Sequence, residues 1–242
     1  MRKKALILGG YGAVGFECAR TLAMNGYDII NVCRIRRSRK EEYVAKKAIL
    51  EQYGATILEV RGNAADEDCI YKVCEELRDY SINCFIHAIA DGNVGNIFTG
   101  ERILKTDSFI HTFKSMCLSF VIWIQELLKY SILDKNSYIF GFTSEGTIGI
   151  FPNYVANGVA KAGLEVLCKY MANELFEQNI YVNIFRAGIM DTNAINALDS
   201  YENFVSLAQK NNYKITNPEK VAEKIMEIIQ NKKIITGQIL DV

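Results

Sequence analysis

Tyr154 and Lys161 are the two residues whose types and spacing point most directly to chemistry. They stand seven positions apart in a segment, residues 153–175, whose apolar residues recur at helical spacing. Seven residues turn an α-helix by about 700°, so both side chains are expected on nearly the same face, roughly 10 Å apart along the axis. A phenol has an ordinary pKa of about 10, and a nearby ammonium favours the phenolate. The pair could therefore donate a proton to a substrate, although Tyr and Lys also share helical faces by chance.

A glycine-rich turn follows the apolar residues 5–8, which are expected to form a short buried strand. Gly10, Gly12 and Gly15 satisfy the GxGxxG pattern, which lets a backbone approach a pyrophosphate at the N-terminus of the next helix. Because the pattern lies between an expected strand and an expected helix, it predicts dinucleotide binding. The residues assigned to this part of the cofactor site are Gly9, Tyr11, Gly12, Ala13, Val14 and Gly15.

The expected second strand, residues 28–33, ends in a basic turn. Five cations crowd residues 34–40, and no carboxylate appears before Glu41. Folds that bind NAD place an acidic residue near this point to hold the ribose 2′-hydroxyl. A 2′-phosphate is the anion that suits cations instead, so Arg34 is predicted to bind NADPH in preference to NADH. The alternative is a solvated basic start of the next helix.

The remaining elements are expected to alternate between helix and strand. Helices are expected at residues 41–53, 66–80, 107–130, 153–175 and 218–231, and strands at residues 55–60, 82–89, 138–142, 180–185 and 235–240. The polar, Asn-rich residues 193–217 are expected to connect two elements as a lid. This alternation predicts an α/β fold, a single-domain Rossmann-type doubly wound parallel sheet with helices on both faces, spanning residues 1–242.

Ligands of such sheets bind outside the carboxyl ends of the strands. Further candidate residues stand at those ends, namely Asn63, Ala64, Ala88, Ala90, Ser144, Gly188, Ile189 and Thr192. Tyr154 and Lys161 follow a strand and belong to the same rim. A nucleotide is therefore expected beside the Tyr and Lys pair.

Composition excludes several other classes of protein. The 242 residues are half hydrophobic with a formal charge of +0, which suits one globular domain and argues against nucleic acid as the main partner. No apolar run reaches the length of a membrane span, and the first apolar segment is too short and Gly-rich for a signal peptide. The seven cysteines lack metal-ligand spacing, so we expect no metal site and reduced thiols in a cytoplasmic protein.

Across nearly its whole length the chain resembles the short-chain dehydrogenase/reductase family. The matching segments are residues 8–15, 63–64, 144, 154, 161, 187–192 and 235–238, although Leu8 and Ala13 depart from the family's TGxxxGxG pattern. Most members have Tyr-x3-Lys, where this chain has Asn157, and the Tyr-x6-Lys spacing is similar to the enoyl-acyl carrier protein reductase branch. Ser144 lies 17 residues before Lys161, at the position of the wider family's catalytic Ser, so the enoyl reductase III form is the nearer likeness.

The resemblance implies an NADPH-dependent oxidoreductase that reduces the 2,3 double bond of an enoyl thioester, carried on acyl carrier protein. Tyr154 would act on the enolate oxygen, Lys161 would hold the nicotinamide ribose and lower the Tyr pKa, and Ser144 would orient the substrate. The long helices at residues 107–130 and 153–175 resemble those through which the family forms homotetramers or homodimers.

Two other functions remain open. A ketoreductase or alcohol dehydrogenase of the same family could use the same Tyr and Lys on a carbonyl substrate. A non-catalytic nucleotide-binding regulator is the other alternative. His87 and His111 are expected to be structural or surface residues.

Overall fold

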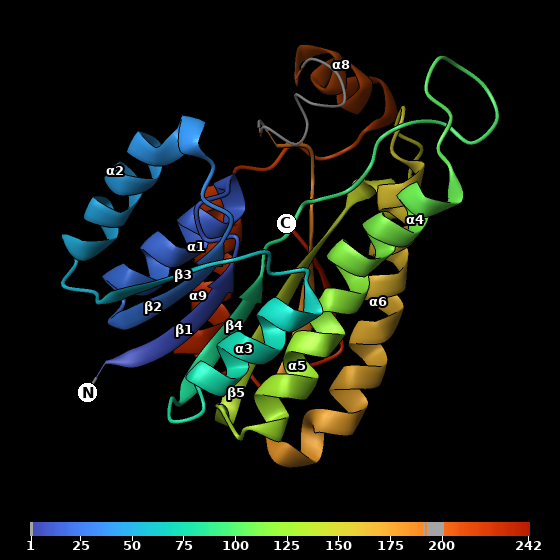
Figure 1. The fold of residues 1–242 in the computed structure, drawn as a ribbon. Helices are drawn as coiled ribbons and strands as arrows, with labels where there is room; N and C mark the ends of the chain where they lie inside the picture. Colours follow the sequence, from blue (N-terminus) through green and yellow to red (C-terminus); the bar gives the residue numbers. More distant parts are fainter. Residues whose placement is uncertain (1, 191, 193–200) are drawn as a thin grey trace.

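Seven parallel strands form one sheet in the computed structural model, which describes residues 2–190, 192 and 201–242. The strands are β1 (Lys3–Leu8), β2 (Tyr27–Cys33), β3 (Ile57–Arg61), β4 (Ile82–His87), β5 (Leu133–Ser144), β6 (Tyr181–Ala187) and β7 (Ile239–Asp241). Their order in the sheet is β3-β2-β1-β4-β5-β6-β7 (Figure 1). The order reverses at β1, which pairs with β2 on one side and with β4 on the other. This reversal is where doubly wound sheets open a crevice for ligands.

Helices cover both faces of the sheet, as predicted (Figure 1). They are α1 (Ala13–Met24), α2 (Lys40–Glu51), α3 (Glu67–Glu76), α4 (Thr106–Phe113), α5 (Ser119–Lys129), α6 (Val155–Leu175), α8 (Tyr201–Asn211) and α9 (Pro218–Gln230). Side chains alternate along a strand, so Ile7 of β1 packs with α1, α2 and α9, whereas Leu8 packs with α3, α5 and α6. The predicted α/β class with helices on both faces is confirmed. No helix of the described residues is long and apolar enough to cross a membrane.

The helix expected over residues 107–130 contains a π-helical turn, Lys114–Leu118, between α4 and α5. Such turns are rare and occur frequently at functional sites. The Ser119 hydroxyl donates to the Ser115 carbonyl at 2.7 Å, and the Ser115 hydroxyl donates to the Asp91 carbonyl. The π-helical turn is thereby fastened to the loop that follows β4.

Residues 201–211 form helix α8, which differs from the polar connection expected there. Phe204 and Ala208 are almost fully buried and cluster with Ile189, which follows β6. Their spacing of four residues was a helical signal that the polar composition of the segment obscured. Residues 193–200 of the expected connection lie outside the described residues.

The last strand is shorter than the expected residues 235–240. Gly237 has a left-handed backbone with φ of 71°, so β7 is confined to Ile239–Asp241. Before this glycine, the Thr236 hydroxyl accepts a hydrogen bond from the Val182 N–H at 2.9 Å. A side chain therefore replaces one bond of the backbone ladder.

Candidate active site

Tyr154 lies directly before α6, not inside its first turn. Asn153 has a left-handed backbone with φ of 58°, and Tyr154 is the N-cap residue, so the helix begins two residues later than expected. A Cβ on Gly146 would lie 2.5 Å from Cε1 of Tyr154. Only a glycine at residue 146 therefore allows the turn after β5 to approach the ring so closely.

The Tyr154 hydroxyl lies 3.0 Å from Oγ of Ser144, within hydrogen-bonding distance. Ser144 ends β5, and its Oγ accepts a bond from the Gly146 N–H at 3.3 Å. The Ser144 proton is therefore available to the Tyr154 oxygen. Burial raises the pKa of Tyr154, and the hydrogen bond with Ser144 opposes that increase. The predicted effect of Lys161 on this pKa stays a prediction.

Lys161 occupies the buried side of α6 and is only 6% exposed. Its ammonium forms neither a hydrogen bond nor an ion pair with any residue that the structure describes. Burial lowers the pKa of Lys161 to about 8, because removal from water disfavours the charged form. A desolvated ammonium without a partner can donate to hydroxyl groups of a ligand, and a cofactor ribose offers such groups.

The glycine turn after β1 is closed by its own backbone. The Gly12 N–H donates to the Gly9 carbonyl at 2.9 Å, and a Cβ on Gly15 would lie 2.3 Å from that carbonyl oxygen. Gly9 has a left-handed φ of 78°, and a Cβ there would lie 2.9 Å from the Ala88 carbonyl oxygen. Asn31, a buried residue of β2, accepts a hydrogen bond from the Gly10 N–H at 2.9 Å. This bond fixes the turn to the neighbouring strand.

Helix α1 starts at this turn with Gly12 as its N-cap and without a side-chain cap. The first-turn N–H groups of Ala13, Val14 and Gly15 consequently have no intrahelical partner. Such groups bind anions, and the glycines of the turn let a phosphate approach the backbone. The glycine turn and α1 therefore fit the pyrophosphate of a dinucleotide.

Tyr11 contributes to the turn only through its backbone. Its ring is 2% exposed and stacks on Tyr43 with ring centres 5.3 Å apart. The Tyr11 hydroxyl donates to Glu59 at 2.5 Å, and burial raises the pKa of this phenol. Any contact of Tyr11 with a cofactor is thus restricted to main-chain atoms. The signal that sequence reasoning missed was Glu59, which faces Tyr11 from β3.

Arg34 forms an ion pair with Asp91 at 2.8 Å. Arg34 follows β2 and Asp91 follows the end of β4, the two strands that flank β1. Strands two positions apart in a sheet are separated by roughly 10 Å, so the ion pair spans the carboxyl end of β1. Arg36 and Arg37 beside it are exposed. Near the start of α2, the hydrogen bonds from Arg39 and Lys46 lower the pKa of Glu42 to about 2. The negative charge of Glu42 is therefore compensated by these two cations.

The other predicted residues lie along the same rim. The Ala64 carbonyl accepts a hydrogen bond from the Trp123 indole at 2.7 Å, which fixes the segment containing Asn63 after β3. The Ala88 N–H donates to the Leu8 carbonyl at 3.0 Å, and Ala90 farther along is exposed. Trp123 was not among the predicted residues, because its apolar surroundings on α5 indicated only core packing.

The segment after β6 is held in place from the opposite side. The Gly188 N–H donates to the Thr216 hydroxyl at 3.2 Å, and the Ile189 N–H donates to the Lys214 carbonyl at 2.8 Å. Ser144 of β5 pairs in register with Ala187, so Gly188 lies next to the Ser144 turn. The predicted Thr192 is described, whereas Asp191 before it lies outside the described residues.

An apolar cavity lies beside Tyr154. Ser144, Glu145, Gly146, Phe151, Tyr154, Ala187, Gly188, Ile189 and Phe204 line it. Phe151 packs edge-on against Tyr154 with ring centres 6.2 Å apart, and α8 contributes Phe204. The cavity places apolar surface next to the Tyr154 hydroxyl.

Asn157 holds a neighbouring loop in place. It is 5% exposed, and its amide donates to the Asn93 carbonyl at 2.9 Å. The contact fastens the loop after β4 to α6. His87 is also buried and bonds Ser119 at 2.8 Å, whereas His111 is exposed on α4. Burial lowers the pKa of His87 to about 3, so this imidazole is neutral.

One rim of the doubly wound sheet carries a glycine turn that fits an anion, an ammonium without a partner among the described residues, and a Ser–Tyr hydrogen bond. This arrangement suits an oxidoreductase that uses a nicotinamide dinucleotide. A family model described as enoyl-(acyl carrier protein) reductase matches residues 11–242. The chain therefore belongs to this family of short-chain dehydrogenases/reductases, as the sequence predicted.

Two curated relatives illustrate the similarity. An enoyl-acyl-carrier-protein reductase (NADH) of Enterococcus faecalis is 25% identical over 228 residues, covering 89% of this chain and 82% of the relative. A 1-cyclohexenylcarbonyl-CoA reductase of Streptomyces collinus is 23% identical over 196 residues, covering 80% of this chain and 67% of the relative.

Solved structures share the fold at low identity. A short-chain dehydrogenase/reductase of Serratia marcescens superposes with a TM-score of 0.84 at 20% identity, covering 99% of this chain and 96% of that one. A short-chain dehydrogenase of Burkholderia cenocepacia in complex with NADP gives 0.83 at 18% identity, with 99% and 96% covered.

Lys161→Met is expected to stabilise the ligand-free protein at pH 7 by on the order of 1–3 kcal/mol, because it removes a desolvated charge. The folded pKa of about 8 lies below the ordinary 10.5, so wild-type stability rises with pH between these values as the folded protein loses the proton first. The advantage of the variant should shrink over that window. Urea unfolding followed by circular dichroism at pH 7, 8 and 9.5 measures it.

Lys169→Met is the matched control, since Lys169 is exposed on the same helix. It should leave the unfolding free energy nearly unchanged at every pH. A Lys161→Met protein that is less stable than wild type at pH 7 contradicts the prediction.

Proposed function

We propose that this oxidoreductase reduces the 2,3 double bond of an enoyl thioester with NADPH. The observation that carries the proposal is the position of the phenol that meets Ser144, seven residues before Lys161. The residue four before Lys161 is Asn157, whose amide is already bonded to the loop after β4. Tyr154 is therefore the only one of these two side chains that can supply a proton.

Each proposed side chain has a separate task. Tyr154 donates to the thioester oxygen, where negative charge develops in the transition state. Ser144 donates to the Tyr154 oxygen and stabilises it as its proton leaves. Lys161 would bind hydroxyl groups of the cofactor ribose, and the nicotinamide would supply the hydride that adds to the β-carbon. The enol formed when Tyr154 protonates the oxygen would then become the saturated thioester as its proton is lost and a proton adds to the α-carbon. The apolar cavity lined by Phe151 and Phe204 takes the acyl chain.

The names of the relatives support this substrate class. One is named for an enoyl group on acyl carrier protein and the other for a cyclohexenylcarbonyl group on coenzyme A. Both names describe a double bond next to a thioester carbonyl. We therefore propose an acyl thioester, on acyl carrier protein or coenzyme A, as the substrate.

The proposed preference for NADPH rests on the turn after β2. Arg34, Arg36 and Arg37 are exposed there, and the strand itself ends in Cys33 without a carboxylate. A 2′-phosphate would give Arg34 a second anionic partner besides Asp91. The Enterococcus relative is named for NADH, the cofactor that the test below compares with NADPH.

The reaction is tested by comparing a crotonyl thioester with a 3-oxoacyl thioester at equal NADPH. We expect faster NADPH oxidation with the crotonyl substrate, followed as loss of absorbance at saturating cofactor.

Tyr154→Phe should lower kcat by about 10²–10⁴, the usual contribution of a positioned acid, and should leave NADPH affinity nearly unchanged.

Tyr71→Phe is the control for the loss of a phenol, because Tyr71 is exposed on α3 and has no place in the proposed site or subunit interface. Its rates should equal those of wild type. A faster reaction with the 3-oxoacyl thioester would assign a ketoreductase. Absence of turnover with both thioesters would reject the proposal.

Cofactor choice is tested with Arg34→Ala. The variant should bind NADPH roughly 10- to 100-fold more weakly, the range for one charge-assisted hydrogen bond, with little change for NADH. Asp91→Asn frees Arg34 from its partner and should not weaken NADPH binding. Fluorescence titration of both cofactors measures these affinities. A wild-type preference for NADH would contradict the assignment.

We also propose that the chain forms a homotetramer or homodimer through α4 and α6, which lie side by side in Figure 1. This face carries apolar side chains that are more than half exposed, namely Ile110 of α4 and Val159, Val166 and Tyr170 of α6.

Light scattering should give two or four times the mass of one chain. Val166→Glu should lower the mass, whereas Val44→Glu on α2 should not; a monomeric wild type rules the proposal out.

A further inference from the structure

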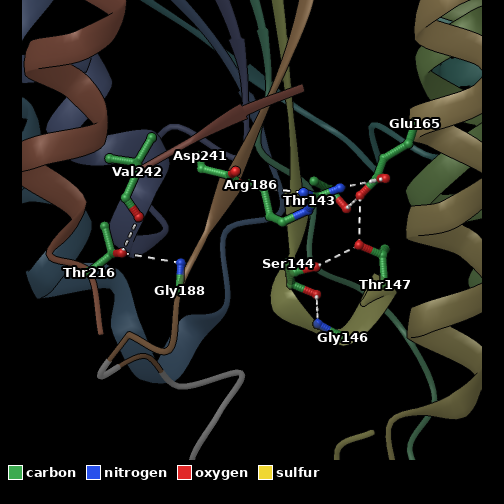
Figure 2. A network of polar contacts seen from close by, with 10 residues as sticks. All are labelled: Thr143, Ser144, Gly146, Thr147, Glu165, Arg186, Gly188, Thr216, Asp241 and Val242. Carbon is green, nitrogen blue, oxygen red and sulfur yellow. Dashed lines mark hydrogen bonds and ion pairs between the residues drawn. The ribbon is translucent and has the colours of Figure 1, made fainter. Parts of the chain in front are cut away.

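Glu165 lies on α6 one turn after Lys161, and its side chain is only 16% exposed. Its carboxylate is fully engaged. Oε1 accepts hydrogen bonds from the Thr143 hydroxyl at 2.6 Å and the Thr147 hydroxyl at 2.8 Å, and Oε2 accepts one from Arg186 at 2.9 Å (Figure 2). Neither Glu165 nor these three partners has a role in the reaction proposed above.

The two threonines that bond the Glu165 carboxylate lie on either side of Ser144 in the chain. Thr143 precedes Ser144 at the end of β5, and Thr147 follows it in the turn. Each hydroxyl has a single proton, and an ionised carboxylate can only accept. Thr143 therefore donates to Glu165, and Thr147 divides its proton between Glu165 and the Ser144 carbonyl, which is 3.0 Å away. Glu165 thus fixes the chain immediately before and after the Ser144 hydroxyl.

Arg186 holds the Glu165 carboxylate in place. It belongs to β6, is 15% exposed, and pairs with Glu165 at 2.9 Å and with the half-exposed Asp241 at 3.2 Å. Glu165 is its better-buried partner, so this contact is the less screened by solvent. Arg186 directly precedes Ala187 and Gly188, so the ion pair joins α6, the Ser144 turn and the end of β6 (Figure 2).

We propose that Glu165 is a positioning residue that holds the Ser144 hydroxyl at hydrogen-bonding distance from Tyr154. Ser144 and Tyr154 come from different elements, and their contact at 3.0 Å is lost if the turn moves by about 1 Å. Glu165 is a residue of α6, as Lys161 is, so its bonds to Thr143 and Thr147 fix the turn relative to the helix that Tyr154 precedes. This role rests on the proposed function of Ser144 and Tyr154.

The first measurement is kcat with whichever thioester the wild type reduces. Thr147→Val keeps the ion pair and the side-chain shape but removes the hydroxyl, and should lower kcat roughly tenfold, the effect of one lost hydrogen bond. Thr147→Ser replaces the hydroxyl and should recover most of that loss. Glu165→Gln removes the charge and should have at least the effect of Thr147→Val.

A double-mutant cycle separates positioning from general damage. If Glu165 acts through Ser144, adding Glu165→Gln or Thr147→Val to Ser144→Ala should change kcat by no more than about twofold. Losses that multiply in the double variants would overturn the proposal. Thr147→Val carries this test if Glu165→Gln does not fold, because it leaves the buried charge pair intact.

The second measurement needs no turnover. The ¹³Cζ resonance of Tyr154 in the ligand-free protein, assigned by its loss in Tyr154→Phe, reports the environment of the phenol oxygen. Thr147→Val and Glu165→Gln should move it toward its position in Ser144→Ala. Ser137→Ala is the control, because it removes a buried hydroxyl bonded to the Ile82 carbonyl at 2.9 Å, away from the Ser144 turn.

The two measurements distinguish the failure of this proposal from that of the proposed function. A resonance that moves as expected in a protein that reduces neither thioester supports the positioning role and rejects the enoyl reductase. A resonance that stays at its wild-type position in both variants overturns the positioning role, whatever substrate the enzyme reduces.

Discussion

The site depends on a close backbone approach between the turn after β5 and the start of α6. A Cβ on Gly146 would collide with the Tyr154 ring, and one on Gly158 would lie 3.1 Å from the Gly146 carbonyl oxygen. Glycine at both positions lets the helix that carries Lys161 come directly against Ser144. The Ser–Tyr hydrogen bond and the mouth of the apolar cavity are consequences of this packing. A larger residue at either position would push the helix away from the sheet edge.

Two charges one turn apart on α6 have opposite surroundings. Glu165 is buried with Arg186 and two hydroxyl groups, so its charge is compensated within the protein. Lys161 is buried without such a partner, and its lowered pKa reflects the unfavourable desolvation. The fold thus combines a stabilising network that shapes the site with a destabilising charge available for a ligand. Proteins commonly retain such strain where function needs an unsatisfied group.

Sequence reasoning succeeded where one local pattern corresponds to one local structure. The GxGxxG turn follows a buried strand and opens α1, and its glycines are needed for the close approaches to Gly9 and Asn31. Alternating apolar segments predicted the layers of the sheet, because burial on both faces leaves a strong signal. The pattern was weaker for α8, where Phe204 and Ala208 are the buried residues among the side chains that the structure describes. It was also weaker for the last strand, which Gly237 shortens.

The amino-acid sequence by itself determined the fold class, the family and the Tyr-x6-Lys spacing, since these follow from residue types at fixed separations along the chain. Only the tertiary structure decided which side chains meet. Tyr11 turns toward Glu59, Arg34 pairs with Asp91, and Asn157 anchors a loop. It also decided that Glu165 connects Arg186 with the threonines around Ser144. These contacts join residues 18 to 64 positions apart, and a hydrogen bond at that separation depends on how strands and helices pack, which no local spacing records.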